Sequence, residues 1–556
     1  MGWPRLLEHR WFPLVLVLLW ALAYLPHLGT RTLRLEEGRR ATPAREMLAS
    51  NDWVRPTLYG DTYLSKPPFY FWIVASIGAL LGEVTALATR LPSVLSSLGC
   101  ALIALRFAPD ILDRKTRALG SLLVLSASTL LDKGTLGEID ATLCLFVAGA
   151  LKIWWDGNRP EGQTIRSWIL VGLLLGVSGL LKGPAGPSLF YLTVVPYAFW
   201  TGRWKRLFSL GHVLCVVLAA IPAAIWIAAL LDRGIVPAGD LLVLWRIQLG
   251  ADHAAATLSD PGGQIKFLLK HYLEFPIQVA GMWLPGFLWL GFGFRRRWAA
   301  SHGLNEDLRR FLVCGAFVPF IIYYLYPQSR PRHLMAAFIP AEILAAYVVF
   351  GMASVPGRFV KRSLRSAIVL SWLPGILGVI GVGLSAVVYQ EGLPIAIATM
   401  FVCIAWTWYS LRTTRETEAS SGVFAFAGTA ACAALAVWFV VNAVVIPWRV
   451  PYSPSHDAFV LSKKLEPNSP VFSTLTFPVK GEGYYNLQFH LSPDIRAVAE
   501  LETLKGLAPC QALVSPLERQ ALESSGWKVE EIGKLGGNKT GLAEVHVIRL
   551  VALTPE

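Results

Sequence analysis

Acidic and basic side chains gather in one short polar segment near the N-terminus. Two adjacent carboxylates, Glu36 and Glu37, precede Arg39, and Lys66 stands before two prolines at the end of the segment. Either carboxylate could act as a general base on an acceptor hydroxyl. Lys66 and Arg39 could bind a phosphate and stabilise the charge that leaves with it. The alternative is a solvated helix over residues 36–49, with carboxylates and arginines paired three or four positions apart.

The rest of the chain indicates where such a segment would lie. Of the 556 residues, 54% are hydrophobic and 16% are charged, whereas a soluble domain has about a quarter charged residues. Long apolar runs alternate with short basic clusters, and each run approaches the roughly 20 residues that cross a bilayer. The 21 tryptophans fit the aromatic belts at membrane interfaces. These features predict a polytopic α-helical membrane protein.

The net charge of +13 is consistent with a membrane protein whose loops are basic. Most of the excess lies in short loops, where lysine and arginine set the orientation of the spans. Membrane lipids with anionic headgroups are therefore the expected partners of these loops, and nucleic acid is not. Six of the seven cysteines lie in apolar runs and no CxxC pair exists, so the sequence predicts neither a disulfide framework nor a zinc site.

The alternation of apolar runs and basic loops predicts the topology. Arg5 and Arg10 place the N-terminus in the cytoplasm, before an uncleaved first span from Trp11 to Leu28. The next run, Pro67 to Gly82, has about 16 residues, which is marginal for a span. We interpret this run as an interfacial or re-entrant helix, because only then does the basic loop after Phe107 remain cytoplasmic.

About thirteen spans are expected in all, which leaves the C-terminus outside. Every expected inner loop is basic. The other twelve spans are Val84–Phe107, Leu119–Leu131, Ala141–Trp155, Trp168–Leu181, Ala185–Trp200, Phe208–Leu231, Phe275–Phe294, Phe311–Tyr326, Leu334–Met352, Ile368–Val388, Ile395–Leu411 and Val423–Pro447.

Residues 1–450 therefore form the expected membrane domain, with two notable outer loops. The first, residues 29–66, is basic although it lies outside, which calls for a separate explanation. The second is the long loop over residues 232–274. Residues 451–556 lack such apolar runs and predict a small periplasmic α/β domain. Its expected strands are Val471–Phe477, Gln511–Val514 and Glu544–Val551, and its expected helices are Asp457–Leu465 and Leu517–Ser524.

The ordered string of the first outer loop carries a family resemblance. An acidic-Glu-x-Arg start is followed by Arg-Glu-Met-Leu-Ala-Ser-x-Asp-Trp from position 45 and then by Lys-Pro from position 66. The string resembles the aminoarabinose–lipid A transferases and the wider protein-O-mannosyltransferase-like (GT-C) clan of membrane glycosyltransferases. The resemblance covers most of the chain. It implies a GT-C-like fold of about thirteen spans, juxtamembrane helices in the first outer loop, and a C-terminal periplasmic α/β domain.

The resemblance also assigns roles to individual residues. Glu36 takes the place of the family's essential Asp near the transferred sugar, so this chain carries a longer side chain there, and the choice between Glu36 and Glu37 stays open. Lys66 matches the lysine that contacts the carrier phosphate, and Asp140 matches a second acidic residue at the next outer turn. Lys182 matches a recurring Lys-Gly turn at an outer span end. The structural alternatives are a helix cap for Asp140 and a snorkelling side chain for Lys182.

Further cations are expected near the phosphate. In the long loop the family tends to show His-x-x-Arg, but the string that starts at His253 lacks the arginine. The candidate substitutes are Arg246, Lys266, Lys270 and His271, of which we choose Arg246. Arg330 and Arg332 resemble a basic outer motif before a late span. As mere flanking charges they would lie on the wrong side of the membrane.

The implied reaction is an inverting glycosyl transfer from a polyprenyl-phosphate-linked sugar at the periplasmic face of the inner membrane. A glycolipid such as lipid A, another glycan or a protein side chain remains open as the acceptor. No P-loop or Rossmann fingerprint is present, so the reaction requires no cofactor. A divalent metal stays open, although no ligand cluster indicates one. Tyr59 and Tyr63 could stack on the sugar or cover the site, and the alternative for both is the interfacial aromatic belt.

Two other functions fit the same composition. A transporter or flippase of a lipid-linked sugar would also need a polytopic bundle with basic headgroup contacts. Such proteins usually show internal repeats and charged residues in mid-span, and we find no repeat and expect the charges at outer span ends. A polysaccharide ligase or polymerase would use the same donors and differ in the acceptor.

Overall fold

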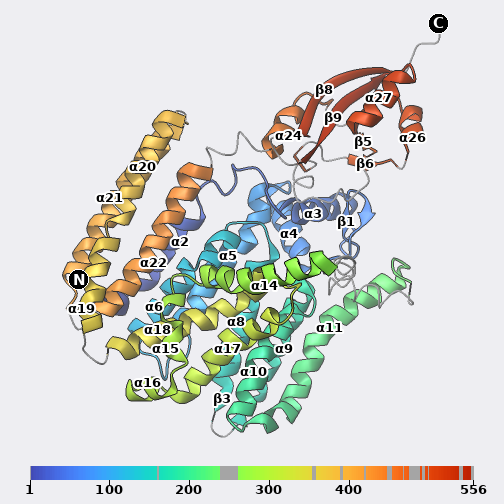
Figure 1. The fold of residues 1–556 in the computed structure, drawn as a ribbon. Coiled ribbons are helices and arrows are strands. Elements are labelled where there is room, and N and C mark those ends of the chain that lie inside the picture. Colours follow the sequence, from blue (N-terminus) through green and yellow to red (C-terminus); the bar gives the residue numbers. More distant parts are fainter. Residues whose placement is uncertain are drawn as a thin grey trace.

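The computed structural model of the chain is mostly helical, with a small sheet near the C-terminus (Figure 1). It describes residues 2–159, 162–237, 261–353, 358–388, 392–418, 421–446, 454–466, 469–474, 489–490, 495–498, 500–537 and 542–551. This arrangement confirms the predicted polytopic α-helical fold with a C-terminal α/β domain. The predicted boundary between residues 450 and 451 lies outside the described residues.

Within the described part of the chain, seven helices are long and apolar enough to cross a membrane, and a bent helix pair is an eighth candidate. The chain is thus a multi-pass membrane protein, while the count of thirteen spans stays a prediction. The seven are Ala86–Leu105, Ile165–Lys182, Leu210–Asp232, Pro331–Ala353, Arg365–Val387, Leu393–Arg415 and Gly422–Val445.

The helices divide into two groups on either side of residue 238. The first group is α1 (Trp3–Glu8), α2 (Phe12–Tyr24), α3 (Gly38–Ser50), α4 (Phe69–Leu81), α5 (Ala86–Leu105), α6 (Arg114–Ser126), α7 (Ser128–Gly134), α8 (Ile139–Gly157), α9 (Ile165–Lys182), α10 (Ala185–Trp200), η1 (Trp204–Phe208) and α11 (Leu210–Asp232). The second group is α14 (Pro261–Met282), α15 (Phe287–Gly293), α16 (Arg296–Ser301), α17 (Glu306–Tyr324), η3 (Pro331–Ala337), α18 (Phe338–Ala353), α19 (Arg358–Leu370), α20 (Leu373–Val388), α21 (Leu393–Arg415), α22 (Gly422–Val440) and η6 (Val441–Val445).

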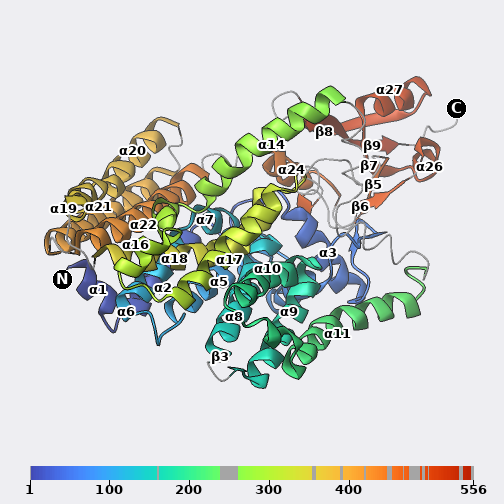
Figure 2. The ribbon, with the colours of Figure 1, turned by 60° about the horizontal axis from the view of Figure 1, so that its bottom comes forward.

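Local sequence explains where several membrane helices begin. Thr85, Thr164 and Ser209 precede α5, α9 and α11, and each hydroxyl accepts a hydrogen bond from the N–H three residues further on. In the apolar stretch of α11 only 17% of the residues are buried inside the protein. Helix α11 and the α20–α21 pair lie at opposite edges of the bundle (Figures 1 and 2), where apolar side chains face lipid.

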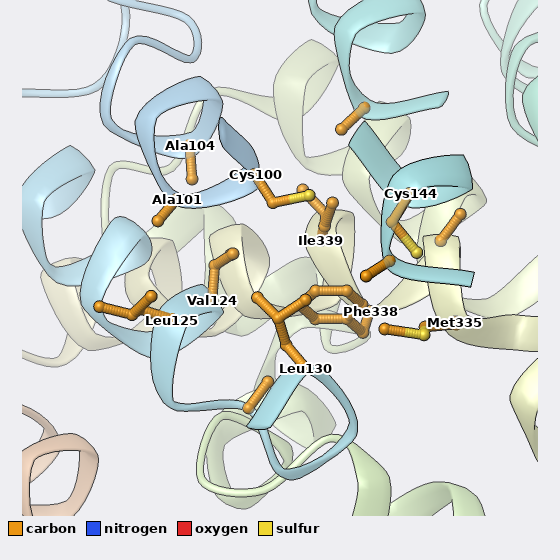
Figure 3. Close-up of a cluster of buried hydrophobic side chains, with 14 of the residues drawn as sticks. Cys100, Ala101, Ala104, Val124, Leu125, Leu130, Cys144, Met335, Phe338 and Ile339 are labelled. Atoms are coloured by element: carbon orange, nitrogen blue, oxygen red, sulfur yellow. The ribbon is translucent and has the colours of Figure 1, made fainter. Parts of the chain in front are cut away.

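Helices η3 and α18 lie in the centre of the bundle. The stretch Pro331–Ala353 is 94% buried. Figure 3 shows Cys100, Val124, Leu130, Cys144 and Phe338 pointing toward one another from α5, α6, α7, α8 and α18. This core fixes η3 relative to the N-terminal ends of α5 and α8, which carry charged residues.

The structure corrects several predicted elements. The expected single span Phe275–Phe294 is a bent pair, α14 and α15, whose axes differ by 104°. The expected long loop over residues 232–274 is helical from Pro261 onward. The expected span Leu119–Leu131 consists of two helices, α6 and α7. The run from Pro67 to Gly82 forms α4, which is shorter than the described spans.

Two of the charged side chains inside predicted spans are completely buried, and Glu342 lies near the middle of its span, so the expectation that charges cluster at outer span ends is wrong there. Arg90 lies in α5 and Glu342 in α18, and both are completely buried. Arg90 has an acidic partner, whereas Glu342 has no hydrogen-bond partner within the described part of the chain.

The C-terminal domain is a five-stranded sheet with short helices. The sheet order is β6-β5-β7-β9-β8, with β5 parallel to β6 and β7, and β9 antiparallel to β7 and β8. The elements are α24 (Pro454–Ser462), β5 (Val471–Ser473), β6 (Ile495–Ala497), α26 (Leu501–Gly506), β7 (Cys510–Val514), α27 (Pro516–Ser524), β8 (Lys528–Gly537) and β9 (Leu542–Val551).

The C-terminal domain is tied to the first loop (Figure 1). Arg45 of α3 donates a hydrogen bond to the Phe489 carbonyl at 3.1 Å, and its guanidinium lies 4.4 Å from the centre of the Phe489 ring. The Leu33 N–H donates to His490 Nε2 at 2.8 Å. The domain therefore sits beside the polar segment that contains the two adjacent carboxylates.

Candidate active site

Donors from three segments of the chain bind the carboxylate of Glu37. Its carboxylate forms a two-pronged ion pair with Arg90 of α5, with Arg90 Nε 2.6 Å from Oε1 and Nη2 2.7 Å from Oε2. The N–H groups of Gly137 and Arg34 donate to the same carboxylate at 2.7 and 2.8 Å. Burial alone would raise the pKa of Glu37, but Arg90, Arg31 and the Gly137 N–H lower it to about 2. Glu37 is therefore ionised, and its lone pairs are occupied by protein donors.

Arg90 extends this contact into a clamp on the first loop. Its Nη1 donates to the carbonyls of Leu28 and Arg31 at 2.7 and 2.9 Å, and its Nη2 donates to the Thr32 carbonyl at 2.9 Å. Sequence reasoning missed Arg90. The available signal was a lone guanidinium inside an apolar run, which is costly in a membrane and demands a partner.

Glu36 faces a different environment from its neighbour. Its side chain is 8% exposed, and Oε2 accepts from Arg39 Nη1 at 3.0 Å and from Arg40 Nη2 at 3.4 Å. Arg332 of η3 approaches Oε1 to 4.0 Å. The two carboxylates thus separate: Glu37 points into α5, and Glu36 lies among guanidiniums from α3 and η3.

Lys66 lies beside these guanidiniums with no carboxylate at ion-pair distance in the described part of the chain. Its Nζ donates only to the Ser65 carbonyl, at 2.8 Å. Burial, followed by the positive charges of Arg40, Lys182 and Arg39, lowers the pKa of Lys66 to about 7. Several cations held this close, with one ammonium lacking a carboxylate partner in the described part of the chain, have the chemistry to bind an anion.

Asp140 and Lys182 form an ion pair that links α8 to the end of α9. Asp140 lies in the first turn of α8 rather than at the cap position, which Glu138 occupies. Lys182 bonds this carboxylate, which the snorkelling alternative does not require. Because Lys182 also acts on Lys66, the pair belongs to the same charged cluster.

Glu138 is a second carboxylate of this turn that sequence reasoning did not select. Both of its oxygens lie near Lys133 Nζ, at 3.2 and 3.1 Å. Burial raises the pKa of Glu138 to about 7, with Lys133 lowering it and Asp140 raising it further. The backbone of the turn is fixed, because the Glu138 carbonyl accepts from Ser93 at 2.6 Å.

The two candidate tyrosines have different surroundings. Tyr63 accepts a hydrogen bond from Arg40 at 3.2 Å, and the Arg39 guanidinium lies 5.6 Å from its ring centre. Burial would raise the pKa of Tyr63, but Arg40 and Arg39 lower it. Tyr59 packs behind α3 instead, where its hydroxyl lies 3.3 Å from the Thr42 hydroxyl.

The structure therefore gathers most of the predicted side chains into one charged cluster at one end of the bundle. Arg330 is an exposed residue that precedes η3, and its N–H bonds His333 Nδ1 at 3.3 Å. Arg246 and His253 lie outside the described residues. The side chains that meet in the cluster, directly or through one neighbour, are those of Glu36, Arg39, Arg40, Tyr63, Lys66, Glu138, Asp140, Lys182 and Arg332.

The chemistry available to this cluster follows from its charges. Lysine and arginine side chains can bind a phosphate and stabilise it as a leaving group, and the adjacent carboxylate can accept a proton or orient a nucleophile. Within the described part of the chain, no three His, Cys, Asp or Glu side chains group together as metal ligands. The roles of the individual residues remain predictions.

The comparisons with known proteins match the predicted resemblance. Residues 65–227 fit the family model of dolichyl-phosphate-mannose-protein mannosyltransferases. The chain is 28% identical over 360 residues to an undecaprenyl phosphate-alpha-4-amino-4-deoxy-L-arabinose arabinosyl transferase of Edwardsiella ictaluri, covering 63% of this chain and 61% of that protein. A transferase of the same name from Pectobacterium atrosepticum is 28% identical over 421 residues, covering 73% and 71%. The match to the Edwardsiella protein thus spans less than two thirds of its length.

Solved structures extend the likeness to the whole chain. The ArnT protein of Cupriavidus metallidurans, bound to undecaprenyl phosphate, has a TM-score of 0.68 with 97% of both chains covered and 18% identity. Its apo form has a TM-score of 0.67 and 20% identity. The comparisons confirm the predicted resemblance to aminoarabinose–lipid A transferase-like GT-C membrane glycosyltransferases, and the structural likeness confirms the fold class.

Proposed function

We propose that this chain is a glycosyltransferase that moves a sugar from a polyprenyl-phosphate carrier to an acceptor, with inversion at the anomeric carbon. The observation that carries the proposal is the environment of Lys66. Its ammonium lies among Arg39, Arg40 and Lys182 beside Glu36 and has no carboxylate partner among the described residues. A phosphate in this place would supply the missing negative charge.

The reaction needs few participants. The acceptor oxygen attacks the anomeric carbon, the bond from that carbon to the phosphate oxygen breaks, and the electron pair leaves with the carrier phosphate. Lys66, Arg39 and Arg332 would stabilise this charge as it develops. If the acceptor is a hydroxyl, Glu36 takes its proton. If the acceptor is a phosphate, it is already ionised, and Glu36 only orients it.

The surroundings of the two carboxylates favour Glu36 as the catalytic residue. Both oxygens of Glu37 are bound by protein donors, including the two-pronged Arg90. A catalytic base must face the substrate, and Glu36 lies among the guanidiniums that would bind the carrier phosphate. We therefore assign Glu37, together with Arg90, to holding the loop, and Glu36 to the reaction.

The names of the relatives suggest the substrates. The transferases of Edwardsiella and Pectobacterium are named for undecaprenyl phosphate and 4-amino-4-deoxy-L-arabinose, so this lipid-linked pentose is the first donor to test. Lipid A is the first acceptor to test, and a glycan or a protein side chain stays second. The proposed setting is the inner membrane, with a cytoplasmic N-terminus and the charged cluster and C-terminal domain in the periplasm.

The decisive experiment measures transfer of a labelled sugar from the undecaprenyl-phosphate-linked pentose to lipid A by the purified protein in detergent. Transfer without a sealed membrane separates an enzyme from a transporter. We expect Glu36→Gln and Lys66→Met to abolish transfer. Glu83→Gln and Lys205→Met, at exposed positions away from the cluster, are the matched controls.

Two outcomes would contradict the proposal. Full transfer by the Glu36→Gln and Glu37→Gln variants alike would remove the base assignment. Absence of transfer with every donor and acceptor class, by wild-type protein that does move lipid-linked sugar across sealed vesicles, would favour the transporter.

A further inference from the structure

Glu342 is a carboxyl group in the interior of a membrane helix, away from the charged cluster. It lies in α18, within the stretch Pro331–Ala353, and it is completely buried. In the described part of the chain neither of its oxygens has a hydrogen-bond partner, and no charged group is close enough to act on it. An ionised carboxylate in this place would cost about 2.5–3.5 kcal/mol or more, so the group keeps its proton.

The carboxyl lies against the break between α14 and α15. A Cβ atom on Gly286 would come within 1.8 Å of Glu342 Oε2 and 3.0 Å of Oε1, so a larger residue there would have to displace the carboxyl group. The Gly286 N–H faces the carboxyl without reaching good hydrogen-bond geometry. Side chain and backbone are thus in direct contact at the point where the helix axis turns by 104°.

The break leaves polar groups at membrane depth that need partners. The Leu284 carbonyl is satisfied by the Ser128 N–H at 3.0 Å. Trp283 Nε1 and the Thr129 hydroxyl, each one residue away from this contact, are buried without a partner. A neutral carboxylic acid can donate through its hydroxyl and accept through its carbonyl, so it can face a backbone break without bringing a charge into the membrane.

A series of helix contacts connects the break to the candidate active site. Helix α14 packs against α7, α17 and η3, and η3 carries Arg332, which approaches Glu36. The carboxyl of Glu342 lies on the same continuous helical stretch, ten residues after Arg332 and about 15 Å along the axis. A contact that fixes the turn of α14 against α18 therefore also fixes the surface on which η3 rests.

We propose that Glu342 is a neutral acid whose contact with Gly286 fixes the α14–α15 break against α18 and so holds α14 against η3, which positions Arg332 beside Glu36. The part that concerns Arg332 rests on the proposed function. The protonated carboxyl and its contact with Gly286 do not, so the two parts can fail separately.

The protonation state has a direct spectroscopic readout. We expect the infrared spectrum of the wild-type protein at pH 9 to contain a carboxylic-acid C=O band that shifts in D₂O and disappears in Glu342→Gln. At this pH Glu138, whose pKa is about 7, is ionised and does not contribute. Identical carboxylic-acid regions in the two proteins would overturn the proposal.

The contact with Gly286 is tested by a double-mutant cycle in thermal unfolding. Gly286→Ala should lower the melting temperature in wild-type protein and lower it much less in the Glu342→Ala background, because the added methyl group then has room. Gly281→Ala is the matched control, since a Cβ at Gly281 meets no neighbour within 4 Å. Additive effects of the two substitutions would show that the contact does not exist.

The positioning role is tested by binding of undecaprenyl phosphate in detergent. Glu342→Gln should bind as wild type, and Glu342→Ala should bind about tenfold more weakly or worse, as a small misplacement of a binding group allows. Arg332→Gln should weaken binding, and adding Glu342→Ala should weaken it no further. If Glu342→Ala costs as much binding affinity in the Arg332→Gln variant as in wild type, Glu342 does not act through Arg332.

Discussion

Donor binding should depend on pH through Lys66. Burial and three neighbouring cations lower the pKa of its ammonium to about 7 in the empty site. A bound phosphate would offset the repulsion from these cations and return the pKa of Lys66 toward its ordinary value near 10.4. Binding therefore takes up a proton wherever Lys66 is neutral in the empty site. Affinity is fully present below pH 7 and falls as the pH rises above 7.

The magnitude follows from the fraction of charged lysine. About half of Lys66 is charged at pH 7 and about 1% at pH 9, which is an approximately 50-fold weakening, or about 2.3 kcal/mol. The donor itself does not titrate here, because a phosphodiester holds a single charge, whereas a phosphomonoester changes charge near pH 6. A phosphodiester of the polyprenol is thus the better probe.

The assay is calorimetric titration of that phosphodiester into the detergent-solubilised protein at pH 7, 8 and 9. Lys66→Arg is the informative variant, because an arginine stays charged over this range and should give a flat profile. Glu138→Gln should make the fall in affinity with rising pH slightly less steep, since Glu138 gains negative charge above pH 7 and then repels the phosphate. A flat wild-type profile, or an unchanged slope in Lys66→Arg, would refute the assignment of the phosphate site to Lys66.

Three further outcomes are expected. Glu37→Gln should destabilise the protein by about 3–5 kcal/mol, because it leaves Arg90 buried and unpaired, and denaturation in detergent would measure the loss. Lys182→Met should weaken phosphodiester binding at pH 6 and should move the fall in affinity to higher pH, because Lys182 lowers the pKa of Lys66, and binding titrations at pH 6 and pH 8 check both effects. Chelation by EDTA should leave sugar transfer unchanged, and a loss that Mg²⁺ or Mn²⁺ restores would contradict a metal-free reaction.

Sequence patterns predicted the parts of the fold that depend on local composition. The basic first loop, with its amphipathic stretch over residues 36–49, contains α3, and the marginal run from Pro67 to Gly82 forms a helix of 13 residues. The strand at Gln511–Val514 and the helix at Leu517–Ser524 are also present at nearly the predicted positions. In each case the pattern and the structure depend on the same few neighbouring residues.

Features that depend on distant contacts were not accessible in this way. Arg90 and Glu37 are separated by 53 positions, and nothing in the local pattern around either residue names the other. The turn between α14 and α15 had a local signal, the Leu-Pro-Gly string at 284–286, which typically marks a break. The apolar composition on both sides outweighed that signal, and so the pair was predicted as one span.

The adjacent carboxylates illustrate why a motif names a site more readily than it assigns roles. Neighbouring positions at the start of a helix point in different directions, so Glu36 and Glu37 cannot share one environment. Glu37 meets Arg90 from α5 and the Gly137 N–H from the turn before α8, and it thereby joins three segments of the chain. Glu36, which precedes α3, meets Arg39 and Arg40 of that helix and Arg332 of η3. The Glu37–Arg90 ion pair fixes the backbone one residue away from Glu36, so it determines where the Glu36 side chain can reach. The role of each carboxylate therefore depends on the distant segments that it contacts, which the motif alone does not specify.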